Sequence, residues 1–441
     1  MTISDPSARS SRVPGYLDGR AVLDQPLLVP EPAADAAEAP AGSLAWLRAT
    51  VARFTGDAQA HARRRAHAMV QLARLDPREL RWAAAGSAVG ADDRHTVVRI
   101  LADQLGLPDP EAVADAVLTV SAGYFCGDLT PAQVKAADEA VASLLTRTAR
   151  KDSAEDLEAA AQGIGLLVQA CDATARLVEH ARRATPDGLP PGDTDALLAE
   201  VLRQDPPVTA LRRRALADVR VGGLDLRAGE VVVIDVIAAG SDVSAGGDQS
   251  DSDPGTDPAT LAFGSGPHRC PGQAQALALA TGLLERDNPA RQVTEAVARV
   301  LDLAATWTAW DGRPLAVDDR VYTPHKAIRR VADHLVDHLA ELEARLAGRE
   351  PQPDHWHASA TTTPADLAPF TPEDLDEARS RLVRLGRVWA DRLGALSDAQ
   401  LDRSPGAGWS FRLLAAHVAG SLDYYAGAVG RLGAADLEEQ V

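Results

Sequence analysis

One short stretch constrains this chain more than any other. Residues 263–272 read FGSGPHRCPG and lead into an Ala- and Leu-rich segment that ends near residue 285. Gly264 and Gly266 permit a tight turn because glycine tolerates unusual backbone angles. Pro271 suits the first position of a helix, where its missing N–H costs nothing. Free N–H groups and the positive end of that helix would favour a thiolate at Cys270. The stretch therefore predicts a thiolate metal ligand or, alternatively, a buried structural cysteine at a helix start.

The wider context favours the metal ligand. Residues 263–272 resemble the cysteine loop of the cytochrome P450 family, Phe-x-x-Gly-x-x-x-Cys-x-Gly. Residues 200–203, EVLR, are similar to the family's Glu-x-x-Arg signature and precede PPV at 206–208 in the family's order. The resemblance covers about residues 45–285. It implies that Cys270 ligates the iron of haem b within a loop that includes Phe263, Gly264 and Gly272. It also implies a buried ion pair between Glu200 and Arg203.

Haem carries propionates, which need cationic or hydrogen-bonding partners when they are partly buried. The family resemblance implies four candidates: His61, Arg65, Arg213 and His268. His61 and Arg65 lie one helical turn apart and share one side of a predicted helix. The alternative for these two is a solvated basic face, because residues 63–65 are a run of arginines.

The resemblance also implies a long helix over the distal face of the haem, with the pattern Ala-Gly-x-(Asp/Glu)-Thr-Thr. The best match is QACDAT at 169–174, which puts Asp172 at the acid and Ala173 at the usual proton-relay threonine. Shifting the alignment by one residue makes Thr174 the threonine but removes the acid. Because oxygen activation needs protons at this place, two alternatives stay open. Asp172 and Thr174 line the oxygen site of a monooxygenase, or the protein is a degenerate haem-binding or peroxide-using protein.

Periodicity predicts a mainly α fold. Residues 1–43, rich in Ala, Pro, Ser and Asp, predict a flexible N-terminal segment. Residues 44–285 predict a compact, α-rich, P450-like haem domain with a small β hairpin or sheet. The hairpin signal is Gly222-Gly223 between two short runs, and residues 231–236 predict a buried strand. The polar stretch 241–259 predicts a long loop.

A second domain is expected after a boundary at 286–292. Helical periodicity recurs at about 293–310, 325–347, 372–395 and 410–432. In the second segment, apolar residues from Ile328 to Leu346 recur every three or four positions. Four amphipathic helices predict a four-helix bundle over 293–441.

The bundle sequence GWSFRLLAAHVAGSLDYY at 408–425 resembles the Trp-Ser-x-x-x-x-x-x-His helix start of the DinB-like superfamily, which includes mycothiol-dependent maleylpyruvate isomerases. YTPHKAIRRVADHLVDHL at 322–339 is similar to a first copy. The resemblance implies a divalent metal, Zn²⁺ or Ni²⁺, held by His334, His338 and His417. His334 and His338 are four residues apart and project from one helix face. Two alternatives stay open: polar residues that flank the core, or a dimerisation or docking module without chemistry.

Composition limits the kinds of binding partner and the cellular location expected for this chain. A formal net charge of −18 argues against nucleic acid and anionic membrane. Cys126, Cys171 and Cys270 give no disulfide framework. The sequence begins without an apolar targeting segment and contains no bilayer-spanning run, so a cytoplasmic protein is expected. The resemblance implies an oxidoreductase that uses O₂ and electrons from a ferredoxin-like partner to oxidise a small apolar molecule. A bifunctional protein, with metal- or thiol-dependent chemistry in the bundle, is the further alternative.

Overall fold

The computed structural model describes residues 10–31, 39–125, 129–148, 153–185, 194–243, 260–317, 319–353, 357–404 and 408–433. The chain forms two compact units: residues 1–81 with 91–281, and residues 82–90 with 282–441. Cys126 and residues 244–259 of the predicted polar loop lie outside the described residues. Within the described ranges, no helix is both long and apolar enough to cross a membrane.

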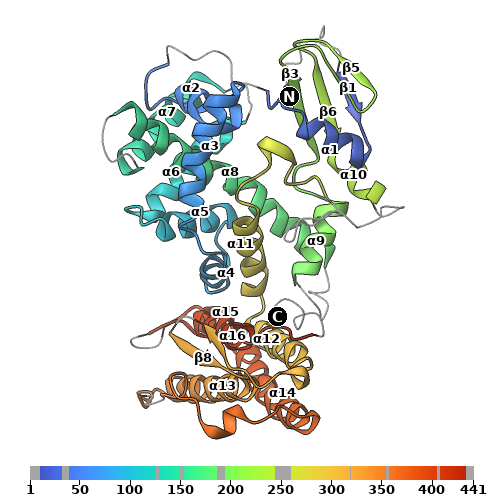
Figure 1. Cartoon of the computed structure of the whole chain (residues 1–441). Coiled ribbons are helices and arrows are strands. Elements are labelled where there is room, and N and C mark those ends of the chain that lie inside the picture. The colour runs from blue at the N-terminus through green and yellow to red at the C-terminus, as the bar shows by residue number, and fades with distance from the viewer. Residues whose placement is uncertain are drawn as a thin grey trace. The chain divides into compact units, whose positions relative to one another are not determined.

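The first unit is mainly helical, as expected (Figure 1). Its helices are α1 (Tyr16–Asp24), α2 (Leu44–Thr50), η1 (Ala52–Phe54), α3 (Ala58–Leu72), α4 (Pro77–Ala85, which continues into the second unit), α5 (Asp93–Gln104), α6 (Pro110–Tyr124), α7 (Pro131–Thr148), α8 (Ala154–Ala184), α9 (Thr194–Gln204), α10 (Val236–Val243), η2 (Gly266–His268) and α11 (Gln273–Arg286, whose last residues belong to the second unit). The 31-residue α8 is capped by Ser153, whose hydroxyl accepts a hydrogen bond from the Asp156 N–H. Asp57 caps α3 in the same way.

A four-stranded sheet brings together strands from the start of the chain and from residues 210–235. Its order is β1 (Ser10–Val13), β6 (Val231–Asp235), β3 (Ala210–Ala215) and β2 (Leu28–Val29). β1 runs parallel to β6, and β2 runs antiparallel to β3. The prediction of a flexible segment is therefore wrong for residues 10–31. Val22, Leu23 and Leu28 are fully buried there in the core on this sheet, so apolar burial offsets the entropy of ordering this segment.

The predicted hairpin and strand are both confirmed. β4 (Val219–Val221) pairs with β5 (Leu224–Leu226) around Gly222 and Gly223. Both glycines have positive φ, 54° and 75°, which matches the two-residue turn that closes such hairpins. The predicted strand at 231–236 is β6, buried at Val231, Val232 and Ile234.

The second unit contains the predicted four-helix bundle. Its elements are α12 (Pro289–Ala304), η3 (Trp307–Ala309), β7 (Leu315–Val317), β8 (Arg320–Tyr322), α13 (Pro324–Leu346), η4 (Pro364–Leu367), α14 (Pro372–Gly394), α15 (Asp398–Leu401) and α16 (Phe411–Gly427). α12 packs against α14 and α16, and α13 packs against the same two helices. The predicted stripe on α13 is buried at Val331, Leu335 and Leu342. Thr323 caps α13 and Thr371 caps α14.

The boundary between the units differs from the predicted one. The first unit ends at residue 281, and residues 82–90 belong to the second. Gly86 lies so close to Leu413 that a Cβ at Gly86 would clash with it. Trp82 meets Trp409 edge to face, with ring centroids 5.9 Å apart. These contacts join segments far apart in the sequence, and local periodicity carries no signal of them.

The close approach of α9 and α10 gives a stability prediction. A Cβ at Gly240 would clash with the carbonyl oxygen of Arg203. Gly240→Ala should destabilise the protein by about 1–3 kcal/mol, as overpacked sites do. In the control, Gly163→Ala in α8, the added methyl meets no atom within 4 Å and should add about 0.5–1 kcal/mol. Urea unfolding followed by circular dichroism measures both variants, and equal stability would contradict the packing.

Candidate functional site

The cysteine loop is a closed turn. The Cys270 N–H donates to the Phe263 carbonyl over 2.8 Å, and the Gly264 N–H donates to the Leu261 carbonyl over 2.8 Å. Gly264 and Gly266 have φ angles of 72° and 66°, where other residues are strained. The expectation that Pro271 begins a helix is wrong, because α11 begins at Gln273.

Two helices hold this loop. From α1, Asp24 accepts a hydrogen bond from the Ser265 hydroxyl over 2.5 Å. The Leu23 carbonyl lies 2.7 Å from where a Gly266 Cβ would be, so only glycine fits there. From α3, Arg65 Nη1 donates to the Arg269 carbonyl over 2.8 Å. The loop that carries Cys270 is thus braced by segments about 200 residues earlier in the chain.

The Cys270 side chain is accessible to solvent. The surrounding protein still desolvates the thiol enough to raise its pKa above the usual value. A hydrogen bond from the Gly272 backbone and the charges of Arg65 and Arg269 act in the opposite direction. The alternative of a buried structural cysteine is therefore wrong. An accessible sulfur with an N–H donor and two cations nearby suits an iron ligand, because metal coordination would deprotonate it.

Cationic and imidazole groups gather beside the loop. The rings of His61 and His268 lie 4.0 Å apart. The pKa of His268 falls to about 3, first through desolvation and then through His61, Arg213, Arg53 and Arg65. Arg213, on β3, is only 3% exposed, and burial followed by the charge of Arg53 lowers its pKa to about 10. Its buried Nε has no hydrogen-bond partner among the described residues.

This cluster fits a haem group. All the neighbouring charges that shift the pKa of His268 or Arg213 are cationic groups. Burying unpaired cations is costly, and haem propionates would supply both the negative charge and an acceptor for Arg213 Nε. The three arginines at 63–65 have different partners. Arg63 and Arg64 form ion pairs with Glu158, whereas Arg65 donates a hydrogen bond to the cysteine loop. Sequence reasoning missed Arg53, which lies in η1 and matches no motif.

The structure corrects the Glu200–Arg203 prediction. The two side chains form an ion pair on α9, but they remain 41% and 27% exposed. A buried pair is therefore wrong. Spacing alone predicts contact between residues three apart on a helix, whereas burial depends on what covers them.

Asp172 and Thr174 lie on α8 as expected, on different sides of it. Two residues along an α-helix correspond to a rotation of about 200°. Thr174 is buried, at 2% exposure, whereas Asp172 is partly exposed and lies 3.9 Å from Arg94. Among the described residues, no hydrogen bond or ion pair joins either side chain to the cysteine loop. At most one of them can face any single site.

An open, largely apolar groove of about 350 Å³ lies elsewhere in the first unit, between α4, α9 and α11. Leu198, Leu202 and Leu277 line it, with Arg78 and Thr281. The groove contains neither Cys270 nor the cationic cluster, so the chemistry assigned to those residues does not depend on it.

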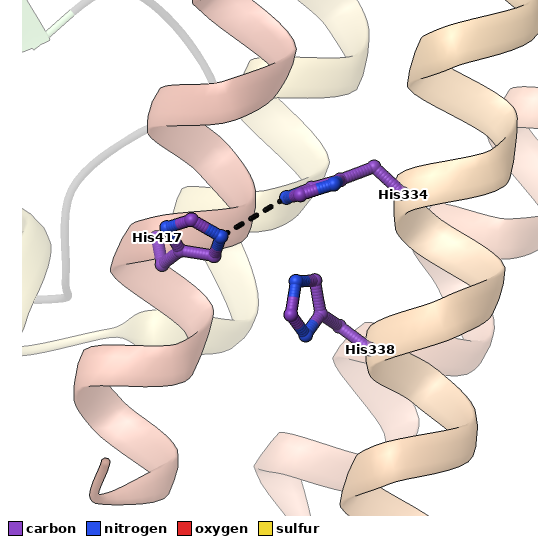
Figure 2. A group of neighbouring side chains, drawn as sticks. All are labelled: His334, His338 and His417. Atoms are coloured by element: carbon purple, nitrogen blue, oxygen red, sulfur yellow. Dashed lines mark hydrogen bonds between the residues drawn. The ribbon is translucent and has the colours of Figure 1, made fainter. Parts of the chain in front are cut away.

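The second unit brings the three predicted histidines together. His334 and His338 from α13 meet His417 from α16, with one ligand atom from each ring within 4.8 Å of the others (Figure 2). His334 Nε2 lies 3.1 Å from His417 Nε2. Desolvation, followed by neighbouring imidazoles, lowers the pKa of His334 to about 3 and that of His417 to about 4. These lowered pKa values favour neutral rings at His334 and His417, the form in which histidine binds a metal.

No protein-family model matches the sequence, and no curated protein does. Among solved structures, the chain is similar to cytochrome P450s. P450BioI, in complex with hexadec-9Z-enoic acid ligated acyl carrier protein, has a TM-score of 0.50 and 17% identity, over 64% of this chain and 85% of that chain. For CalO2 the TM-score is 0.49 and the identity is 22%, over 62% of this chain and 81% of that chain. For ligand-free CYP164A2 of Mycobacterium smegmatis the TM-score is 0.45 and the identity is 20%, over 64% of this chain and 84% of that chain. The likeness to P450BioI shows a mainly α, P450-like fold.

Exposure sets the expected cost of breaking each ion pair. Glu200→Ala removes a partly exposed pair and should cost at most about 1 kcal/mol. Arg412 is fully buried and binds Asp398 and Asp402 over 2.8 and 2.7 Å. Asp402→Ala leaves the buried Arg412 guanidinium without its closer acid, and should cost more than Glu200→Ala, up to about 3 kcal/mol, because an uncompensated buried charge is costly. Thermal unfolding of both variants measures the difference, and a larger loss from Glu200→Ala would contradict the exposed pair.

Proposed function

We propose that the first unit is a haem-thiolate oxidoreductase of the monooxygenase type, with Cys270 as the iron ligand. The observation that carries this proposal is the meeting of an accessible thiol with a cationic cluster that has no acidic partner among the described residues. A structural cysteine explains neither feature. A porphyrin with two carboxylates explains both.

Each residue of the cluster has a role in this proposal. His61, Arg65, Arg213 and His268 hold the propionates, and Arg53 adds positive charge behind them. The Gly272 N–H stabilises negative charge on the Cys270 sulfur. Phe263 and Gly264 close the turn that presents the sulfur. When bound, haem iron supplies oxygen binding and reduction.

Electrons come from a ferredoxin-like donor in this proposal, and the substrate is a small apolar molecule. Proton delivery separates this activity from the peroxide-using alternative. Asp172 and Thr174 lie on different sides of α8, and Ala173 between them has no proton to give. One of the two residues, assisted by water, then carries the protons. A protein without such a route uses peroxide instead.

Spectroscopy tests the thiolate. Wild-type protein reconstituted with haem should give the red-shifted Soret band of a thiolate-bound carbonyl complex after reduction and CO addition. Cys270→Ser should lose this band, because serine is a poor substitute for a thiolate ligand. Cys171→Ser is the control, since Cys171 is buried in α8 and should leave the band unchanged. A wild-type protein unable to take up haem would falsify the proposal.

A second proposal concerns the bundle: a Zn²⁺ or Ni²⁺ site of the DinB-like type at His334, His338 and His417. Its support is the convergence of three imidazoles, two of which, His334 and His417, have strongly lowered pKa values. Ligands at about 2.05 Å from a tetrahedral zinc lie roughly 3.3 Å apart, close to the 3.1 Å between His334 Nε2 and His417 Nε2. An open fourth position would activate a water or a thiol. The chain would then be bifunctional.

Metal content tests the second proposal. Full-length wild-type protein, loaded with Zn²⁺ and dialysed, should keep about one zinc per chain by elemental analysis. His417→Ala should lose it, because two imidazoles make a poor zinc site. His325→Ala is the matched control on α13, since His325 lies against the Pro369 carbonyl outside the three-histidine group. A folded wild type that binds no zinc would leave the docking-module alternative.

A further inference from the structure

A chain of hydrogen bonds runs along α13 from one histidine of the metal site. His338 Nδ1 lies 2.8 Å from Glu341 Oε2. The other carboxylate oxygen, Oε1, accepts a hydrogen bond from Arg345 Nη1 over 2.9 Å. Arg345 also donates to the Trp409 carbonyl. One continuous series of contacts therefore links the His338 ring to the segment that leads into α16.

The members of this chain are well fixed. The Arg345 side chain is only 3% exposed, and its guanidinium lies 5.1 Å from the centre of the Phe411 ring. Both Glu341 oxygens already have partners. Glu341 is also absent from the described group of side chains whose ligand atoms converge. Its carboxylate therefore acts on His338 and is not a fourth ligand.

The chemistry of the contact decides the state of the ring. An ionised carboxylate only accepts hydrogen bonds, so His338 Nδ1 must carry the proton. In the neutral ring this leaves the lone pair on Nε2, the nitrogen free to bind a metal. A carboxylate behind a ligating histidine fixes its tautomer, holds its orientation and raises its basicity.

We propose that Glu341, held by Arg345, is the positioning residue that orients His338 for metal binding. The proposal rests on the three-histidine site of the second proposed function. His334 and His417 lie beside each other, whereas His338 has its closest polar contact with Glu341. Glu341 thus determines whether the third imidazole is available as a ligand.

Zinc affinity of the full-length protein, measured by competition with a chelating dye, tests the proposal. Glu341→Ala should weaken zinc binding about 10- to 100-fold, the usual effect of removing such a partner. Glu341→Gln keeps an oxygen acceptor of the same reach and should lose less. Glu343→Ala is the matched control, because Glu343 lies on the same helix, carries the same charge and pairs with Arg392. It should bind zinc like the wild type.

A metal-free readout separates positioning from general loss of structure. In ¹⁵N NMR spectra of the zinc-free wild type, His338 should show the Nδ1–H tautomer. Glu341→Ala should give a mixture of tautomers, while Glu341→Gln should retain the wild-type form. If Glu341→Ala binds zinc as tightly as the wild type, the metal site stands and the positioning role is wrong. If the wild type itself binds no zinc, the metal site is wrong, and this role falls with it.

Discussion

In the part of the first unit that the structure describes, the central constraint is a group of positive charges without an acidic partner. Arg53, Arg65 and Arg213 lie beside His268, whose pKa falls to about 3, first through burial and then through His61 and these three charges. Arg213 is only 3% exposed, and a folded chain rarely buries a cation unless something neutralises it. The unpartnered Nε of Arg213 marks where an acceptor is missing among the described residues. In the proposed function, a porphyrin with two propionates bound through Cys270 would satisfy both requirements, and it would connect the electrostatics of the cluster to the proposed redox chemistry.

The position of the cysteine depends on segments far from it in sequence. Asp24 of α1 binds Ser265, and Gly266 packs against the end of the same helix. Arg65 of α3 binds the Arg269 carbonyl from another direction. Residues 10–31 therefore matter for the loop, because α1 within them supports the segment that carries Cys270. Their Ala-, Pro- and Ser-rich surroundings conceal this role.

The bundle combines an apolar stripe with a polar one on the same helix. Val331, Leu335 and Leu342 of α13 are buried in the core, while His334, His338, Glu341 and Arg345 follow one another at steps of four, three and four residues. This second periodicity places ligands and their supporting groups on adjacent turns. A bundle needs only the apolar stripe to fold, so a polar stripe with every member engaged is consistent with a site.

The sequence by itself determined the local features. The turn at Gly222-Gly223, the strand at 231–235 and the helices of the bundle follow from backbone preferences and from periodicity, and the likeness to P450BioI confirms the expected fold class. The sequence also named Cys270, His61, Arg65, Arg213 and His268, because their spacing matched a family pattern. It could not show that Glu200 and Arg203 stay partly exposed, or that Asp172 and Thr174 lie on different sides of α8. Nor could it show that Arg53 belongs to the cationic cluster and Glu341 to the group around the three histidines. Burial and convergence arise from contacts between residues distant in the chain, and only the tertiary structure decides them.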